Sequence, residues 1–302
     1  MSTPETRKPS MTLGRCMLRA LPLVGVMVVL LLSPAPGCAQ VDLASIPPGE
    51  TLYEIELEDG SEFVARLLAR DGDTLTLQTV GGASLTVRVA DVREALVARG
   101  YTTDGEFRRA DPNESRLFFA ATGRTLGQGQ AYASAYFGVL PFIGYGITDR
   151  ITIAAGAPVL LGELEPFWIA PKIKVVDRDR TDVALGVLHF VLEDEQAGIA
   201  YGVGTFGGDD GGVSIGLGFG YTGSDVESNP AIMVGLEGRG RGAKFISENY
   251  LIPGEIGVIS GGVRFIGRRF TADLGVAAGG TDGEFACCLP VVSVSYAFGR
   301  GR

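Results

Sequence analysis

The stretch "VSIGLGFGY" at residues 213–221 alternates without a break between large and small side chains. Val213, Ile215, Leu217, Phe219 and Tyr221 share one parity, and the other parity holds only one serine and three glycines. Successive side chains of a β-strand point to opposite faces, so one face of this segment is bulky and apolar and the other is almost bare. A strand of a soluble sandwich places polar groups opposite its core face, which this segment does not do.

The same pattern recurs along the last two thirds of the chain. Between residues 115 and 302, twelve alternating segments are separated by turn residues, and none shows the 3.6-residue repeat of an amphipathic helix. In a transmembrane barrel, large residues face lipid and the other parity faces the lumen, where small residues let a narrow barrel close. The sequence therefore predicts an all-β fold, with an antiparallel transmembrane β-barrel of about 12 strands over residues 115–302.

The last segment, "VSVSYAF" at residues 292–298, places Val292, Val294, Tyr296 and Phe298 on one parity. It resembles the closing strand of bacterial outer-membrane β-barrels, which alternates apolar residues and ends on an aromatic residue, although Gly299 to Arg302 follow here. The resemblance implies insertion by the barrel-assembly machinery, contact with outer-membrane lipid and location in the cell outer membrane. It implies no activity, because such barrels include pores, enzymes and inert anchors.

The N-terminus predicts an export signal over residues 1–39. Four basic residues precede the apolar run 21–32, which is too short for a spanning helix, and Ala39 precedes a plausible cleavage site. Cys38 leaves a lipoprotein open, and Met11 is an alternative start. Without residues 1–39 the chain has 22 basic and 34 acidic residues, a net charge of −12, which opposes binding to nucleic acid.

Residues 40–97 differ from the rest and predict a small separate domain. Three turn dipeptides, Asp59-Gly60, Asp71-Gly72 and Gly81-Gly82, separate four short alternating runs. Four strands in so short a segment resemble an SH3-like or Sm-like barrel in general shape. The polar, aperiodic residues 98–114 predict a linker. An even strand count and short polar turns at one end place this domain in the periplasm, where it can hold a partner.

Charged residues on the small parity are the candidate site residues. The functional interpretation is a charged constriction that filters ions or small solutes, and the alternative is a set of ion pairs that fill a narrow barrel. These predicted lumen charges are Lys172, Lys174, Glu237, Arg239, Arg264 and Asp273.

Catalytic chemistry finds little support in the sequence, and no catalytic, cofactor-binding or metal-binding residue is predicted. His189, the only histidine, shares a parity with lipid-facing valines and lacks the serine found in the outer-membrane phospholipase motif. The adjacent pair Cys287 and Cys288 leaves a strained disulfide open. We therefore expect a barrel of structural or adaptor type without cofactors. The alternatives are a narrow solute channel and, with less support, a lipid-modifying enzyme.

Overall fold

The computed structural model describes residues 47–158, 167–192, 195–281 and 284–299. These residues form nineteen β-strands and one short 3-10 helix. Within the same ranges, no helix is long and apolar enough to cross a membrane. The predicted signal segment 1–39, including Cys38, lies outside the described residues.

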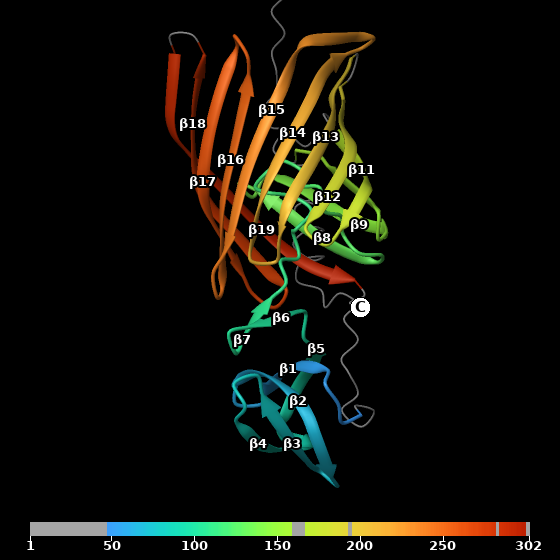
Figure 1. The fold of residues 1–302 in the computed structure, drawn as a ribbon, viewed down its shortest axis with the longest axis vertical. Helices are drawn as coiled ribbons and strands as arrows, with labels where there is room; N and C mark the ends of the chain where they lie inside the picture. The colour runs from blue at the N-terminus through green and yellow to red at the C-terminus, as the bar shows by residue number, and fades with distance from the viewer. Residues whose placement is uncertain (1–46, 159–166, 193–194, 282–283, 300–302) are drawn as a thin grey trace, which may run out of the picture.

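Twelve consecutive strands close into one antiparallel barrel, which confirms the predicted fold class (Figure 1). Each strand pairs with its neighbours in sequence, and the last strand closes the ring on the first through the pairs from Ser293↔Tyr136 to Gly299↔Gln130. The barrel strands are β8 (Gln130–Tyr136), β9 (Leu140–Thr148), β10 (Ile151–Gly156), β11 (Phe167–Arg178), β12 (Thr181–Val191), β13 (Gln196–Gly208), β14 (Gly211–Thr222), β15 (Asp225–Arg239), β16 (Ala243–Ile252), β17 (Ile256–Ile266), β18 (Phe270–Thr281) and β19 (Glu284–Gly299).

Two of the predicted segments differ from the observed strands. Residues 116–126, expected to form the first barrel strand, form bends and one isolated bridge between Arg116 and Ala121. Residues 130–148, expected as one segment, fold back at Phe137 to give β8 and β9. The two differences compensate, so the number of barrel strands stays at twelve.

The barrel is apolar outside and polar inside. Ile215, Leu274 and Val294 are about half exposed on its outer surface, at 52, 51 and 52%. Their neighbours in sequence point inward and are buried, among them Ser214 and Asp273. Near the end where β18 begins, four strands carry exposed phenylalanines on the outer surface: Phe206, Phe245, Phe265 and Phe270. An apolar outer band with an aromatic girdle is the surface of a transmembrane barrel.

The small domain is a five-stranded antiparallel sheet with the order β4-β3-β2-β1-β5. It has one strand more than the four runs predict. Its buried residues come from alternate positions and include Tyr53, Ile55, Leu75 and Leu77. The elements are β1 (Leu52–Leu57), β2 (Glu62–Asp71), β3 (Thr74–Thr79), β4 (Ser84–Arg88), the 3-10 helix η2 (Val89–Asp91) and β5 (Val92–Val97).

The segment expected to be a linker contains a hairpin, β6 (Gly100–Thr103) and β7 (Glu106–Arg109). Gly105, at the turn of this hairpin, has a positive φ of 74°, a conformation that glycine adopts at no steric cost. In Figure 1 the hairpin lies between the small domain and the barrel. Residues 98–109 are therefore ordered structure that joins the two bodies.

The small domain contacts the barrel through ion pairs at the turn between β17 and β18. Arg268 Nη2 lies 3.0 Å from Glu94 Oε2, and Arg268 Nη1 lies 2.8 Å from Glu56 Oε2. Arg268 Nε lies 3.2 Å from Glu54 Oε2, and Arg269 also pairs with Glu94 at 3.0 Å. One barrel turn thus supplies two arginines to an acidic face of the small domain.

Candidate functional site

Residues 110–129, here called the plug, run through the lumen of the barrel. Leu117 and Phe118 are fully buried there, as are Asn113 and Thr122. Leu117 and Phe118 pack with Val203, Met233, Ile246 and Val291, which come from four different strands. The lumen of this barrel is therefore occupied by the protein's own chain.

Glycines on the lumen face make room for the plug. A Cβ added at Gly235 would lie 2.1 Å from Leu117 Cδ1, and a Cβ added at Gly146 would lie 2.1 Å from the Gly127 carbonyl oxygen. Real Cβ atoms do not approach other atoms so closely, so a side chain at either position would displace the plug. The glycines on the lumen face of the strands thus leave room for the plug, because small residues let its backbone approach the wall.

Arg264 on β17 is fully buried, at 0% exposure. Its Nε donates to Asp273 Oδ1 at 2.6 Å, and its Nη2 donates to the Leu117 carbonyl at the same distance. Its Nη1 donates to Asp111 Oδ2 at 3.0 Å and to the carbonyls of Asn113 and Arg116. This guanidinium therefore holds four plug residues against the wall.

Arg116 of the plug makes the reciprocal contacts. Its Nη1 donates to Asp273 Oδ2 at 3.3 Å and its Nη2 donates to Ser295 Oγ at 3.1 Å. The guanidinium also lies 5.4 Å from the ring centroids of Tyr136 and Phe142, within cation–π range. Asp273 is thus shared by two buried arginines, one from the wall and one from the plug.

Lys172 on β11 holds the plug from the other side. Its Nζ donates to the carbonyls of Ser115 at 2.8 Å, Thr122 at 2.9 Å and Arg124 at 2.5 Å. Three carbonyls satisfy all three donors of an ammonium group. In the ring of twelve, β11 lies six strands from β17, so Lys172 and Arg264 grip the plug from opposite walls.

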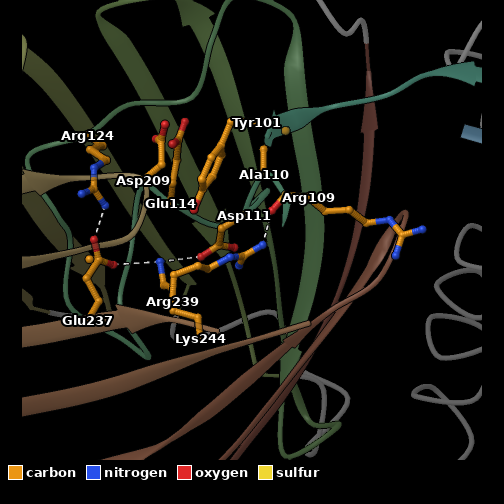
Figure 2. A pocket seen from close by; sticks show the side chains of 12 residues that line it. Tyr101, Arg109, Ala110, Asp111, Glu114, Arg124, Asp209, Glu237, Arg239 and Lys244 are labelled. Carbon is orange, nitrogen blue, oxygen red and sulfur yellow. Dashed lines mark hydrogen bonds and ion pairs between the residues drawn. The ribbon is translucent and has the colours of Figure 1, made fainter. Parts of the chain in front are cut away.

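A chain of ion pairs continues toward the end of the barrel nearest the small domain (Figure 2). Arg124 pairs with Glu237 of β15, whose other oxygen lies 2.8 Å from Lys244 Nζ on β16. Lys244 in turn lies 2.6 Å from Asp111. Beside this chain is a cavity of about 160 Å³, whose lining includes Tyr101, Glu114, Arg124, Asp209, Glu237, Arg239 and Lys244.

Glu248 on β16 provides one further contact with the plug. Its side chain is buried, and Oε2 accepts a hydrogen bond from the Phe119 backbone N–H at 3.0 Å. The Tyr250 hydroxyl donates to Glu248 Oε1 at 2.5 Å. This carboxylate therefore binds plug backbone from β16.

The six predicted lumen charges all lie on the lumen face of their strands. Lys172, Glu237 and Arg264 bind the plug directly, and Asp273 binds it through Arg116. Lys174 pairs instead with Asp177 and Asp182 near the turn that follows β11. Arg239 donates to the Arg109 carbonyl of β7.

Arg116, Arg124 and Asp111 were not among the predicted site residues, because residues 116–126 were expected to form a strand and residues 98–114 a linker. Lys244 and Glu248 were not predicted either, since both parities of β16 carry polar residues and no bare face marks the lumen. The adjacent phenylalanines 118 and 119 in the plug break strand alternation, and this signal indicates a segment outside the wall.

The remaining predicted residues lie apart from this network. His189 lies on the outer face of β12, where its Nδ1 is 2.7 Å from the Tyr221 hydroxyl. Cys287 and Cys288 are exposed free thiols. Val292, Val294, Tyr296 and Phe298 share the outer face of β19, and three of them stand opposite alanines of β8. Across the described ranges, no group of three or more His, Cys, Asp or Glu residues could hold a metal ion.

Comparison with known proteins gives a likeness of fold only. No protein-family model matches the chain, and no curated protein matches it. Among solved structures, the KdgM porin has a TM-score of 0.42 at 8% identity and covers 56% of this chain and 98% of its own. The Pseudomonas aeruginosa OccK11 structure has a TM-score of 0.30 at 11% identity and covers 83% of this chain and 94% of its own.

A third similar structure is a loop-deletion mutant of OmpT, an outer-membrane protein of Vibrio cholerae. Its TM-score is 0.33 at 12% identity, and it covers 82% of this chain and 95% of its own. All three TM-scores lie below 0.5, so a function has to be inferred from the site of this chain.

Proposed function

We propose that the chain is an outer-membrane β-barrel of structural or adaptor type, sealed by its own plug, that holds the small domain in the periplasm. The apolar outer band supports a membrane location, because it would be an aggregation-prone surface in water. The small domain contacts the turn between β17 and β18, at the end of the barrel where β18 begins, and we place this end in the periplasm.

The observation that carries the proposal is the grip on the plug from opposite walls. Lys172 and Arg264 together donate to six plug backbone carbonyls, and an unpaired buried carbonyl or ammonium group costs several kcal/mol. A plug bound in this way closes the lumen at rest. The barrel then serves to anchor the small domain rather than to pass solutes.

The small domain is the adaptor part of this proposal. Its strand order, with β1 paired to both β2 and β5 and a 3-10 turn before β5, supports an SH3-like module. A module of this kind would bind a periplasmic partner. A pull-down with the full chain in detergent tests this, with the small domain deleted in the control chain.

Single-channel recording in planar bilayers tests the sealed barrel. The unaltered chain should be silent, and a chain whose residues 113–126 are replaced by glycine and serine at equal length should conduct. Arg241→Ala, which changes an exposed side chain outside the plug, is the matched control and should stay silent. Steady conductance of the unaltered chain would contradict the sealed barrel.

A narrow solute channel is the second candidate, and the charged cavity beside Arg239 and Lys244 favours it. A channel would show ion-selective conductance in the unaltered chain, and Lys172→Glu would change that selectivity because the charge lies inside the lumen. Silence of both chains would leave the anchor as the function.

A further inference from the structure

A partly enclosed cavity lies where the hairpin β6–β7, the plug and the barrel meet (Figure 2). Its volume is about 160 Å³, and its wall includes Tyr101 of the hairpin, Glu114 of the plug and Arg239 of β15. Since one water occupies about 30 Å³ in the liquid, this space holds roughly five water molecules. The cavity is therefore large enough for a small organic molecule that contacts all three parts of the chain.

Two acids on the wall of this cavity have no counter-charge. Glu114 and Asp209 lie near each other and repel, and their carboxylates are on the same side of the cavity (Figure 2). Among the residues that the structure describes, neither carboxylate takes part in a hydrogen bond or an ion pair. Two like charges of this kind favour a ligand that brings a positive group.

Most other charges on the wall are already paired with one another. Lys244 Nζ lies 2.6 Å from Asp111 and 2.8 Å from Glu237. Arg124 also pairs with Glu237. These ion pairs satisfy both acids and both bases, so none of the four needs a ligand.

Arg239 is the cation of the cavity that has no carboxylate beside it. Its Nη2 donates to the Arg109 carbonyl, whereas its Nε and Nη1 are buried and have no hydrogen-bond partner in the described ranges. The hydroxyl of Tyr101 donates to Asp210 at 2.9 Å and brings no charge to the guanidinium. The side chain of Arg109 points away from the cavity and pairs with Glu54. A buried guanidinium with free N–H groups favours a ligand that brings a negative group.

The unpaired acids and the unpaired guanidinium lie on different sides of one cavity. In the view of Figure 2, the carboxylates of Glu114 and Asp209 are at the top, and Arg239 lies below them. A simple cation or anion would satisfy one side and be repelled by the other. A molecule with a positive and a negative group satisfies both sides at once.

We propose that this cavity binds a small zwitterion, such as a short amino acid, with its amino group against Glu114 and Asp209 and its carboxylate against Arg239. The bound molecule contacts the hairpin, the plug and the barrel, so its binding stabilises the junction of these three parts. This inference goes beyond the sealed barrel, because a ligand in this cavity does not require the lumen to open.

Isothermal titration calorimetry tests the site on the full chain in an uncharged detergent, at about pH 8, where carboxylates and amino groups are charged. The probes are alanine, β-alanine and 4-aminobutyrate, in which an increasing number of carbons separates the two charges. At least one probe should bind. Its matched compounds without the amino group (propionate or butyrate) or without the carboxylate (ethylamine or propylamine) should bind at least about tenfold more weakly.

The proposal is overturned if none of the three zwitterions binds. It is also overturned if a matched compound binds as tightly as the zwitterion from which it is derived, because the cavity would then recognise a single charge.

Two substitutions test the two ends of the ligand separately. Arg239→Gln should weaken the zwitterion about tenfold or more without weakening the amines, because it removes only the positive charge. Asp209→Asn should weaken the zwitterion without weakening the acids. Asp209 is exposed in a turn, so this variant keeps the barrel intact, as heat-dependent gel mobility can verify.

Arg241→Gln is the matched control, because Arg241 is an exposed arginine two residues from Arg239. It should leave the affinity for the zwitterion unchanged, which excludes a general effect of charge. Unchanged affinity in both the Arg239→Gln and the Asp209→Asn chains would overturn the proposed site.

Discussion

Arg264 shows what a single side chain does in this barrel. A buried guanidinium loses its hydration, and only good geometry with acids and carbonyls compensates for that loss. Here Asp273, Asp111 and three plug carbonyls supply the partners. The same contacts fix the plug to β17, so the residue that stabilises the interior also closes the lumen.

Removal of this side chain should therefore be costly. We expect Arg264→Ala to lower the free energy of unfolding by about 3–5 kcal/mol, because Asp273 is left buried with only part of its compensation. Urea unfolding in detergent, followed by Trp168 fluorescence, measures this. Arg241→Ala removes an exposed arginine and should change the value by less than about 1 kcal/mol. Equal effects of the two substitutions would refute the structural role of Arg264.

Glycines on the lumen face determine how closely the plug packs against the wall. Gly146→Ala places a Cβ against the Gly127 carbonyl, so we expect a loss of about 1–3 kcal/mol from displaced plug backbone. Gly238→Ala, at a strand position with open space around it, is the control and should be close to neutral. The same urea experiment compares them, and a neutral Gly146→Ala would argue against close packing of the plug.

At the scale of elements, the turn between β17 and β18 docks the small domain. We expect Arg268→Ala to loosen this contact, because one guanidinium pairs with Glu54, Glu56 and Glu94. Limited proteolysis of the hairpin segment 98–109 should become several-fold faster. Arg150→Ala, in another turn at the same end, should leave the rate unchanged. If both chains are cleaved like the unaltered protein, the docking does not depend on these pairs.

The docking contact should also respond to acid. Hydrogen bonds from Arg93 and then Arg268 hold the pKa of Glu56 below its ordinary value of 4.5. A lowered carboxyl pKa contributes stability above the ordinary value, and that contribution disappears as the pH falls through the lowered pKa. Pepsin cleavage of segment 98–109 should accelerate from pH 4.5 downward. The Glu56→Gln chain should lack this part of the pH dependence, and identical profiles would rule Glu56 out.

The alternation of large and small residues predicted the strands of the barrel wall, but it did not predict the plug that fills the lumen. In segments such as 213–221 the period of two is complete, so strand, face and lumen parity follow directly from the residues. The plug sequence shows no regular alternation of large and small residues, because its residues contact different strands of the barrel wall. Leu117 meets Gly235, and Phe119 meets Glu248 and Tyr136. Contacts of this kind depend on closure of the ring, which a local pattern does not encode.

The turn at Phe137 was missed for a related physical reason. Turn residues are recognised by polarity and glycine content, and this turn is apolar apart from Gly138. Without polar side chains to mark the turn, residues 130–148 look like one long strand. The lumen charges could be predicted because an isolated charge on a bare parity stands out, whereas their partners in the plug could not be predicted in this way.

At the scale of the whole molecule, one chain forms three parts: a small domain, an internal plug, and a barrel that is apolar outside and polar inside. The plug directly follows the hairpin β6–β7, so a force on the small domain reaches the plug through residues 98–110. Ion pairs at the C-terminal end of this segment link it to both bodies, through Arg109 to Glu54 of the small domain and through Asp111 to Arg264 of the barrel. This continuity supports the proposed role of the barrel as an anchor for the small domain.

Contact between the outer face and acyl chains is the central claim, and a nitroxide label at Ile215 tests it most directly. In a chain with Cys16, Cys38, Cys287 and Cys288 each replaced by serine, the label on Ile215→Cys should collide readily with oxygen dissolved in lipid. It should also be shielded from a water-soluble nickel complex. Ready collision with nickel and poor collision with oxygen would contradict the account, because that side chain would then face water.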